Sequence, residues 1–141
     1  MTKKNIPFTF VFDYLFPLEV KVKSMFGLRA IYVSKKIMLI LRQRPGFPET
    51  NGVWIATNQE HHKSLKNDLP SMCSISTYSD VSSETEWQVL PVDSDDFESS
   101  VRKVCELIKH NDYRIGRIPI PVKPRTYNII KFKMILFLEK I

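Results

Sequence analysis

Few residues in this sequence have the types and spacing needed for catalysis or metal binding. His61 and His62 are adjacent, so on a helix their side chains point about 100° apart and cannot bind one metal ion. A zinc-binding pair requires i, i+4 or similar spacing. Cys73 and Cys105 form no CxxC pair, and no neighbouring charge pattern predicts a lowered thiol pKa. We therefore interpret these residues as surface histidines and buried core cysteines.

An acidic run at Asp93, Asp95, Asp96 and Glu98 resembles a carboxylate site. Acidic side chains are also favoured in the first turn of a helix, where they meet the positive end of its dipole. A helix start explains this run better. The four glycines are scattered and form no phosphate-binding loop. We predict no catalytic, cofactor-binding or metal-ligating residue, and a protein that is not an enzyme.

Length and composition indicate one soluble domain. The chain has 141 residues, with 43% hydrophobic and 26% charged residues. Two distant cysteines fit a reduced, cytoplasmic protein better than a disulfide scaffold. Asp13 and Pro17 interrupt the apolar stretch near the start, so we expect no signal peptide. No apolar run approaches the roughly 18–20 residues that a membrane span needs.

The net charge of +6 is unevenly distributed. Residues 60–111 hold five Lys/Arg and ten Asp/Glu, whereas residues 112–141 hold seven and two. A basic tail is typical of a solvated, solubilising segment, and also of non-specific nucleic-acid binding through phosphate contacts. For the second alternative, the candidate residues are Arg114, Arg117, Lys123, Arg125, Lys131 and Lys133, with Tyr127 and Phe132 placed to stack on bases.

The centre of the sequence predicts a β-sheet with two apolar faces. The segments 27–33, 37–41 and 53–56 are rich in β-branched, aromatic and aliphatic residues, and the Pro/Gly-containing stretch after Arg44 predicts a loop. Strict alternation places Leu28, Ala30 and Tyr32 on one face and Arg29, Ile31 and Val33 on the other; in the next segment it separates Ile37, Leu39 and Leu41 from Met38, Ile40 and Arg42.

Such a sheet is either covered by helices on both faces or contacts a partner or second subunit on one of them. In the second case we expect a homodimer or a protein partner. The candidate partner-binding residues are then Arg29, Arg42, Arg44 and Trp54, because Arg and Trp are favoured in interfaces. The alternative is that Trp54 is a core residue and that the arginines only flank the sheet.

The remaining elements follow from local signals. Residues 8–16 are aromatic and fit a strand or a helix that ends before Pro17; we favour the helix. Residues 18–23 alternate as an extended lead-in to the sheet. Thr57 and Glu60 match a capping box that starts a helix reaching Leu69.

Strands are predicted at 72–78 and 86–92, the latter with a proline typical of an edge strand. After Asp93 or Ser94 as cap, residues 97–108 carry one apolar helical stripe. Three prolines mark residues 119–124 as a linker, and residues 129–138 are apolar. This last stretch adds a strand or a short helix to the domain or to a neighbour, and the sequence leaves these alternatives open.

The predicted order is α+β: helix, three strands, helix, two strands, helix, with helices on an antiparallel sheet. This order, with Met25-Phe26-Gly27 before an Ile-Tyr-Val strand, resembles the N-terminal domain of the TfoX/Sxy competence regulators over roughly residues 9–118. The stretches NGVWIAT (51–57) and DYRIGRIP (112–119) are similar to signatures of a narrower branch of that family.

The resemblance implies an α+β fold related to secretion chaperones, and a small cytoplasmic bacterial protein without catalytic residues. It divides the chain into a domain at 1–118 and a basic tail at 119–141. The sequence has no room for the second domain of TfoX, so competence regulation does not carry over. We expect a protein-interaction or regulatory module without a cofactor; the alternative is the tail-based nucleic-acid binder.

Overall fold

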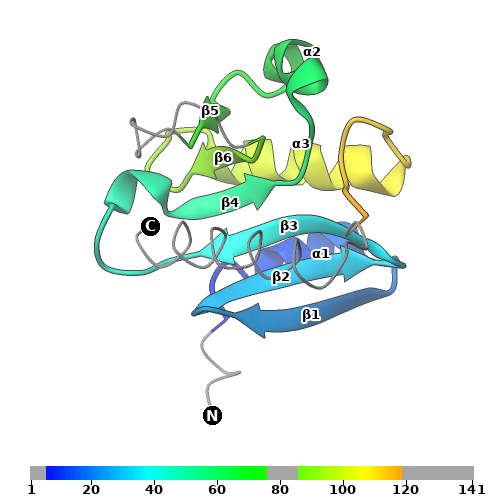
Figure 1. Ribbon diagram of the computed structural model, residues 1–141, viewed down its shortest axis with the longest axis horizontal. Helices are drawn as coiled ribbons and strands as arrows, with labels where there is room; N and C mark the ends of the chain where they lie inside the picture. The colour runs from blue at the N-terminus through cyan, green and yellow to red at the C-terminus, as the bar shows by residue number, and fades with distance from the viewer. Residues whose placement is uncertain (1–5, 76–85, 119–141) are drawn as a thin grey trace, which may run out of the picture.

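The computed structural model describes residues 6–75 and 86–118 and confirms the predicted α+β class. Its core is one antiparallel sheet of six strands in the order β1-β2-β3-β4-β6-β5 (Figure 1). The helices are α1 (Phe10–Leu15), α2 (His62–Asp68) and α3 (Phe97–Lys109), with short 3-10 turns η2 (Pro48–Thr50) and η3 (Gln59–His61). The strands are β1 (Val20–Met25), β2 (Leu28–Val33), β3 (Lys36–Arg42), β4 (Gly52–Ile55), β5 (Cys73–Ser74) and β6 (Gln88–Pro91).

The sheet contains one strand more than the predicted order. The stretch interpreted as an extended lead-in forms β1, which pairs with β2 from Val20 opposite Val33 to Met25 opposite Leu28. Its four central residues are exposed, and lysine alternates along it. Charged side chains are typical of edge strands, where they discourage pairing with other chains. The correct order is therefore helix, four strands, helix, two strands, helix.

The N-terminal segment is helical, as favoured. Helix α1 buries Val11 and Leu15. It ends at Phe16, whose backbone is extended with ψ 137°. The physical reason is Pro17, because a residue before proline is disfavoured in the helical region.

A β-bulge corrects the predicted assignment of side chains in β3. Ile31 pairs with Leu39, but the next residue, Tyr32, pairs with Ile37, so Met38 is the extra residue. As a result, Ile37 lies on the same face as Ile40, and Met38 lies with Leu39. Strict alternation had predicted that Ile37 shares a face with Leu39 and that Met38 shares a face with Ile40.

The predicted capping box does not form. Helix α2 begins only at His62, after η3, and its first turn has no side-chain cap. The Thr57 hydroxyl instead donates to the carbonyl oxygen of Arg114 at 2.7 Å. The Thr57 hydroxyl therefore bonds to a residue 57 positions away in the chain instead of to the first turn of a helix.

Helix α3 carries the predicted apolar stripe. Phe97, Val101, Val104, Cys105 and Ile108 are all buried. The predicted cap at position 93 or 94 is wrong, because the N-cap is the residue at position 96 and no side chain caps the helix. The Ser94 hydroxyl donates instead to the carboxylate of that residue at 2.7 Å.

The last two strands are shorter than predicted. Only Cys73–Ser74 of the stretch expected at 72–78 joins the sheet, and residues 76–78 lie outside the described part. Pro91 pairs with β4 but lies beyond the two residues where β5 pairs with β6, so it occupies an edge-like position. Cys73 is exposed, which corrects the expectation that both cysteines are buried.

All three described helices contribute to the core on one face of the sheet, which we call the helix face. In Figure 1, α1 and α3 lie behind the sheet, and their buried side chains pack on Ile31, Leu39 and Leu41. Leu65 and Leu69, from α2 and its end, belong to the same cluster. Burying each such side chain is worth roughly 1.5–3 kcal/mol.

We predict that Val104→Asp prevents stable folding, because it places an unpaired carboxylate in this core. The expected loss is more than about 4 kcal/mol in the free energy of unfolding, measured by urea titration. Lys103→Asp on the exposed side of the same helix is the control. Similar stability of the two variants would contradict the assignment of the helix face.

We also predict that Gly52→Ala destabilises the protein much more than Gly46→Ala. Both glycines have positive φ, but an added Cβ would lie 2.0 Å from the Leu90 carbonyl oxygen at Gly52 and would meet nothing at Gly46. Gly46→Ala then costs only the free energy of holding a residue other than glycine at positive φ, which is about 1–2 kcal/mol. Thermal unfolding of both variants measures the difference, and equal losses would refute the close contact between β4 and β6.

Candidate interaction surface

The other face of the sheet is also apolar, and we call it the second face. It is formed by side chains of β2, β3, β4 and β6 together with two residues from neighbouring loops. None of its buried members comes from a helix of the described residues. The buried members are Leu28, Ala30, Ile37, Ile40, Trp54, Ala56, Ile75 and Val89, and Met25, Tyr32 and Trp87 are partly buried around them.

The second face is buried within a single chain. Leu28, Ile40 and Trp54 have no exposed surface, although they project away from α1 and α3. Side chains standing on a sheet stay accessible unless another layer lies over them, because successive strands only shield each other laterally. The second face therefore requires a covering layer that the described helices do not provide.

A hydrogen bond and a contact between rings hold the Trp54 side chain within this face. Its indole Nε1 donates to the Thr50 carbonyl oxygen at 2.9 Å. Its ring lies 6.2 Å from that of Trp87, tilted by 57°. With the only polar atom of the side chain satisfied, the indole contributes apolar surface alone.

Arg42, a second predicted partner-binding residue, lies buried at the end of β3. Its guanidinium donates to Asn51 Oδ1 at 2.6 Å and to the Gly46 carbonyl oxygen at 3.2 Å. Asn51 also bonds both backbone polar groups of Arg44. These bonds fold the loop between β3 and β4 back on the sheet, which is a structural role that the sequence did not reveal.

The other two predicted residues lie at different places. The Arg44 guanidinium donates to the Phe26 carbonyl oxygen at 2.9 Å and thereby connects this loop to the β1–β2 turn. Arg29 is half-buried and alternates with Leu28 and Ala30, which places it toward the helix face. The structure thus brings Arg42 and Trp54 together on the second face, with Arg44 at its end, and separates Arg29 from them.

Of the predicted nucleic-acid-binding residues, Arg114 and Arg117 are described, and both contact carboxylates. Arg114 Nη2 lies 2.8 Å from Asp112 and 2.9 Å from Asp68. Arg117 lies 3.4 Å from Glu86. The other four residues, Lys123, Arg125, Lys131 and Lys133, lie outside the described part of the chain.

The two stretches that resemble family signatures lie side by side. Besides the bond from Thr57 to Arg114, the amide of Gly116 donates to the Ala56 carbonyl oxygen at 2.7 Å. Arg117 and Ile37 exchange two backbone hydrogen bonds of 2.9 and 3.0 Å. The described chain therefore ends at Ile118, beside a member of the second face.

The titratable groups show no catalytic arrangement in the described residues. Burial raises the pKa of the Cys105 thiol to about 12, so the thiol is protonated at neutral pH. His62 Nε2 donates to the Glu86 carbonyl oxygen at 3.0 Å. No group of three His, Cys, Asp or Glu side chains within 6–75 and 86–118 is placed to bind a metal ion.

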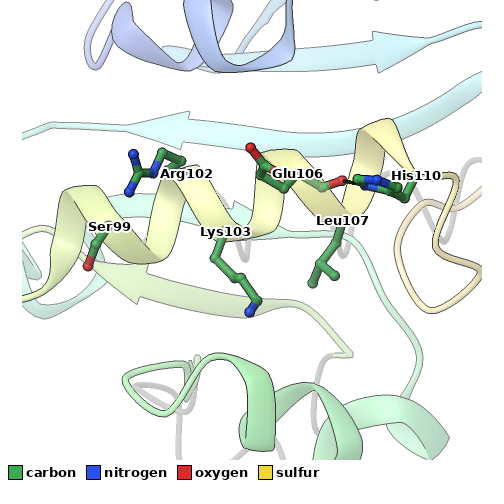
Figure 2. A pocket seen from close by; sticks show the side chains of 6 residues that line it. All are labelled: Ser99, Arg102, Lys103, Glu106, Leu107 and His110. Atoms are coloured by element: carbon green, nitrogen blue, oxygen red, sulfur yellow. Dashed lines mark hydrogen bonds between the residues drawn. The ribbon is translucent and has the colours of Figure 1, made fainter.

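A shallow hollow of about 430 Å³ lies along the outer side of α3 (Figure 2). In this view Arg102 and Glu106 point to one side of the helix, whereas Lys103 and Leu107 point to the other. His110 Nδ1 donates to the Glu106 carbonyl oxygen at 2.8 Å. Because these side chains diverge, the hollow offers no convergent set of polar groups to a ligand.

Comparisons with protein-family models, with curated proteins and with solved structures find no significant match to this chain. The resemblance to the TfoX/Sxy N-terminal domain stays a prediction. Within residues 6–75 and 86–118, every helix is too short or too polar to cross a bilayer.

The Arg114 cluster generates a pH-dependent prediction. The hydrogen bond from Arg114 holds the pKa of Asp112 below its ordinary value. The stabilisation is therefore complete above about pH 4 and is lost as the pH falls through the lowered pKa. We expect Asp112→Asn to lose about 1–3 kcal/mol at pH 7 and to show a flatter fall in stability between pH 4 and 2 in urea titrations.

Asp93→Asn changes an exposed aspartate and serves as the control for charge alone. This control should keep both the stability at pH 7 and the acid dependence of the unchanged chain. Parallel pH profiles for Asp112→Asn and the unchanged chain would contradict the role of the cluster.

Proposed function

We propose that this protein is a non-enzymatic interaction module that binds its partner through the second face of the sheet. The proposal agrees with the small, non-catalytic type of protein that the resemblance to the TfoX/Sxy N-terminal domain implies. The observation that carries it is the second apolar face, which no helix of the described residues covers.

The energetics of this face require that it stay covered. Each large apolar side chain that leaves water contributes roughly 1.5–3 kcal/mol, and the face brings eight buried apolar residues into one cluster. A continuous apolar patch is unfavourable when exposed to water, so a partner that reaches this face has to replace the layer that buries it in the single chain. Binding to a partner then works by exchange, in which one covering layer replaces another.

The composition of the face indicates the kind of partner. Its surface consists of aliphatic side chains and Trp54, with the partly buried Met25, Tyr32 and Trp87 around it. Met, Tyr and Trp are enriched in protein interfaces. The apolar cluster itself contains no charged group, and the guanidinium of Arg42 at its end already donates to Asn51 and Gly46. The matching partner is therefore an amphipathic segment that lays an apolar stripe on the sheet.

The charged groups support a binding role rather than catalysis. The Asp112 and Arg114 pair is mutually neutralising, and the buried Cys105 thiol lies in the core of the helix face. Catalytic groups act from a cavity that admits a substrate. Neither of these groups lines the hollow on α3.

We predict that Tyr32→Ser at the edge of the second face weakens partner binding at least about 30-fold, as truncation of an interface hot spot does. Tyr113→Ser is the matched control, because Tyr113 is 78% exposed and does not belong to the face. Affinity capture with quantitative mass spectrometry identifies retained proteins, and sedimentation velocity detects self-association.

The expected result is a partner or dimer that the control variant keeps and the Tyr32→Ser variant loses, with both variants folded by circular dichroism. The proposal fails if the chain remains monomeric at high concentration without a specific partner. It fails equally if both variants retain the same partner with the same affinity.

A further inference from the structure

Strand β1 forms one edge of the six-stranded sheet, and within the described residues no strand pairs with its outer side (Figure 1). The four central residues of this strand, Lys21, Val22, Lys23 and Ser24, are exposed. The opposite edge strand, β5, is only two residues long. A strand of six residues that is exposed at a sheet edge presents backbone N–H and carbonyl groups to which the strand of another chain can add.

The turn between β1 and β2 determines which backbone groups of β1 point outward. This turn consists of the two residues 26–27, and both have positive φ, as in a type I′ hairpin. The pair that flanks such a turn, Met25 and Leu28, exchanges backbone hydrogen bonds, and every second pair along the ladder does the same. The N–H and carbonyl groups of Val22 and Ser24 therefore point away from β2, toward the outer edge.

The side chains of β1 alternate between the two faces of the sheet. Lys21 and Lys23 stand opposite Tyr32 and Ala30 in the ladder, so both lysines project on the side of the second face. Val22 projects on the other side and is 38% exposed. The Lys23 ammonium lies 5.0 Å from the centre of the Tyr32 ring, where cation–π attraction helps to hold the charge in place. The edge thus presents a positive, an apolar and a positive side chain in succession.

The charge around this edge is strongly positive. Residues 18–44, which contain β1, β2 and β3, hold seven Lys/Arg and one Asp/Glu, so their net charge of +6 equals that of the whole chain. Opposite charges on facing strand positions stabilise strand pairing, whereas like charges destabilise it. An antiparallel copy of β1 would place lysine against lysine. The charge pattern therefore disfavours a second copy of this chain and favours an acidic strand.

We propose that β1 is a docking edge for an extended acidic segment of a partner protein, which adds to the sheet as a further antiparallel strand. Two acidic side chains of this segment, two residues apart, face Lys21 and Lys23, and an apolar side chain between them covers Val22. Backbone hydrogen bonds to Val22 and Ser24 supply affinity, and the alternating side chains supply specificity. This inference goes beyond the proposed function, because it uses the edge of the sheet and not its second face.

The test uses a fluorescently labelled peptide with the alternating sequence Ser-Glu-Val-Glu-Val-Glu-Ser. Fluorescence anisotropy at about 150 mM salt measures the affinity of the peptide for the full chain. We expect binding at least about ten-fold tighter than that of Ser-Val-Val-Glu-Glu-Glu-Ser, which has the same composition without the alternation. Absence of binding by the alternating peptide, or equal affinity of the two peptides, would overturn the inference.

Two variants of β1 test the backbone and the charges separately. Val22→Pro removes an outward N–H group and keeps the ladder to β2, so the chain should fold and lose affinity about ten-fold or more. Lys21→Glu/Lys23→Glu should lose the acidic peptide and bind Ser-Lys-Val-Lys-Val-Lys-Ser instead. The control Lys63→Glu/Lys103→Glu makes the same charge change at exposed helical positions and should keep the acidic peptide. Full affinity in a folded Val22→Pro chain, or equal losses in the two double variants, would contradict the docking edge.

Amide hydrogen exchange covers the case in which Val22→Pro does not fold. In the unchanged chain without peptide, the amides of Lys21 and Lys23 should exchange slowly, because they bond to β2. The amides of Val22 and Ser24 should exchange fast and become several-fold slower when the alternating peptide is added. Slow exchange at Val22 and Ser24 before the peptide is added, or protection by the peptide only at other elements, would refute the proposal.

Discussion

The structure depends on one constraint, namely that its central sheet is apolar on both faces and has to be covered on both. The helix face satisfies this requirement with α1, α3 and the end of α2, which together bury Val11, Leu15, Leu69 and the stripe of α3. The second face has an equally continuous cluster around Trp54. Removing such a surface from water supplies much of the stability of a small domain. What covers the second face therefore matters both for the stability of the domain and for its function.

Local patterns were sufficient to predict much of the fold. The α3 stripe, the apolar segments of β2, β3 and β4, and the helix that ends before Pro17 all follow from periodicity, composition and the geometry of proline. In each case the signal lies within a few residues of the element that it specifies. The predicted α+β class followed from the order of these elements.

The errors occurred where a contact joins distant residues. Pairing of β1 with β2, the alternative partner of Thr57 and the bonds of Arg42 to the loop 46–51 all depend on the tertiary arrangement. The bulge at Met38 changes the face of a side chain without a distinctive composition. For the candidate surface, the sequence predicted two apolar faces and placed Trp54 among the candidate residues. It did not show that Arg42 stabilises the loop or that Arg29 lies apart.

The most direct measurement of the central claim is a nuclear Overhauser experiment on the methyl groups of Ala30 and Ala56 in the full chain. Both methyl groups are buried in the second face. Binding through the second face predicts that these methyl groups gain contacts to protons of the partner or of a second copy, whereas the methyl groups of Val101 and Val104 in the helix face gain none. Intermolecular contacts only at the helix face, or at neither face in the presence of the partner, would contradict the account.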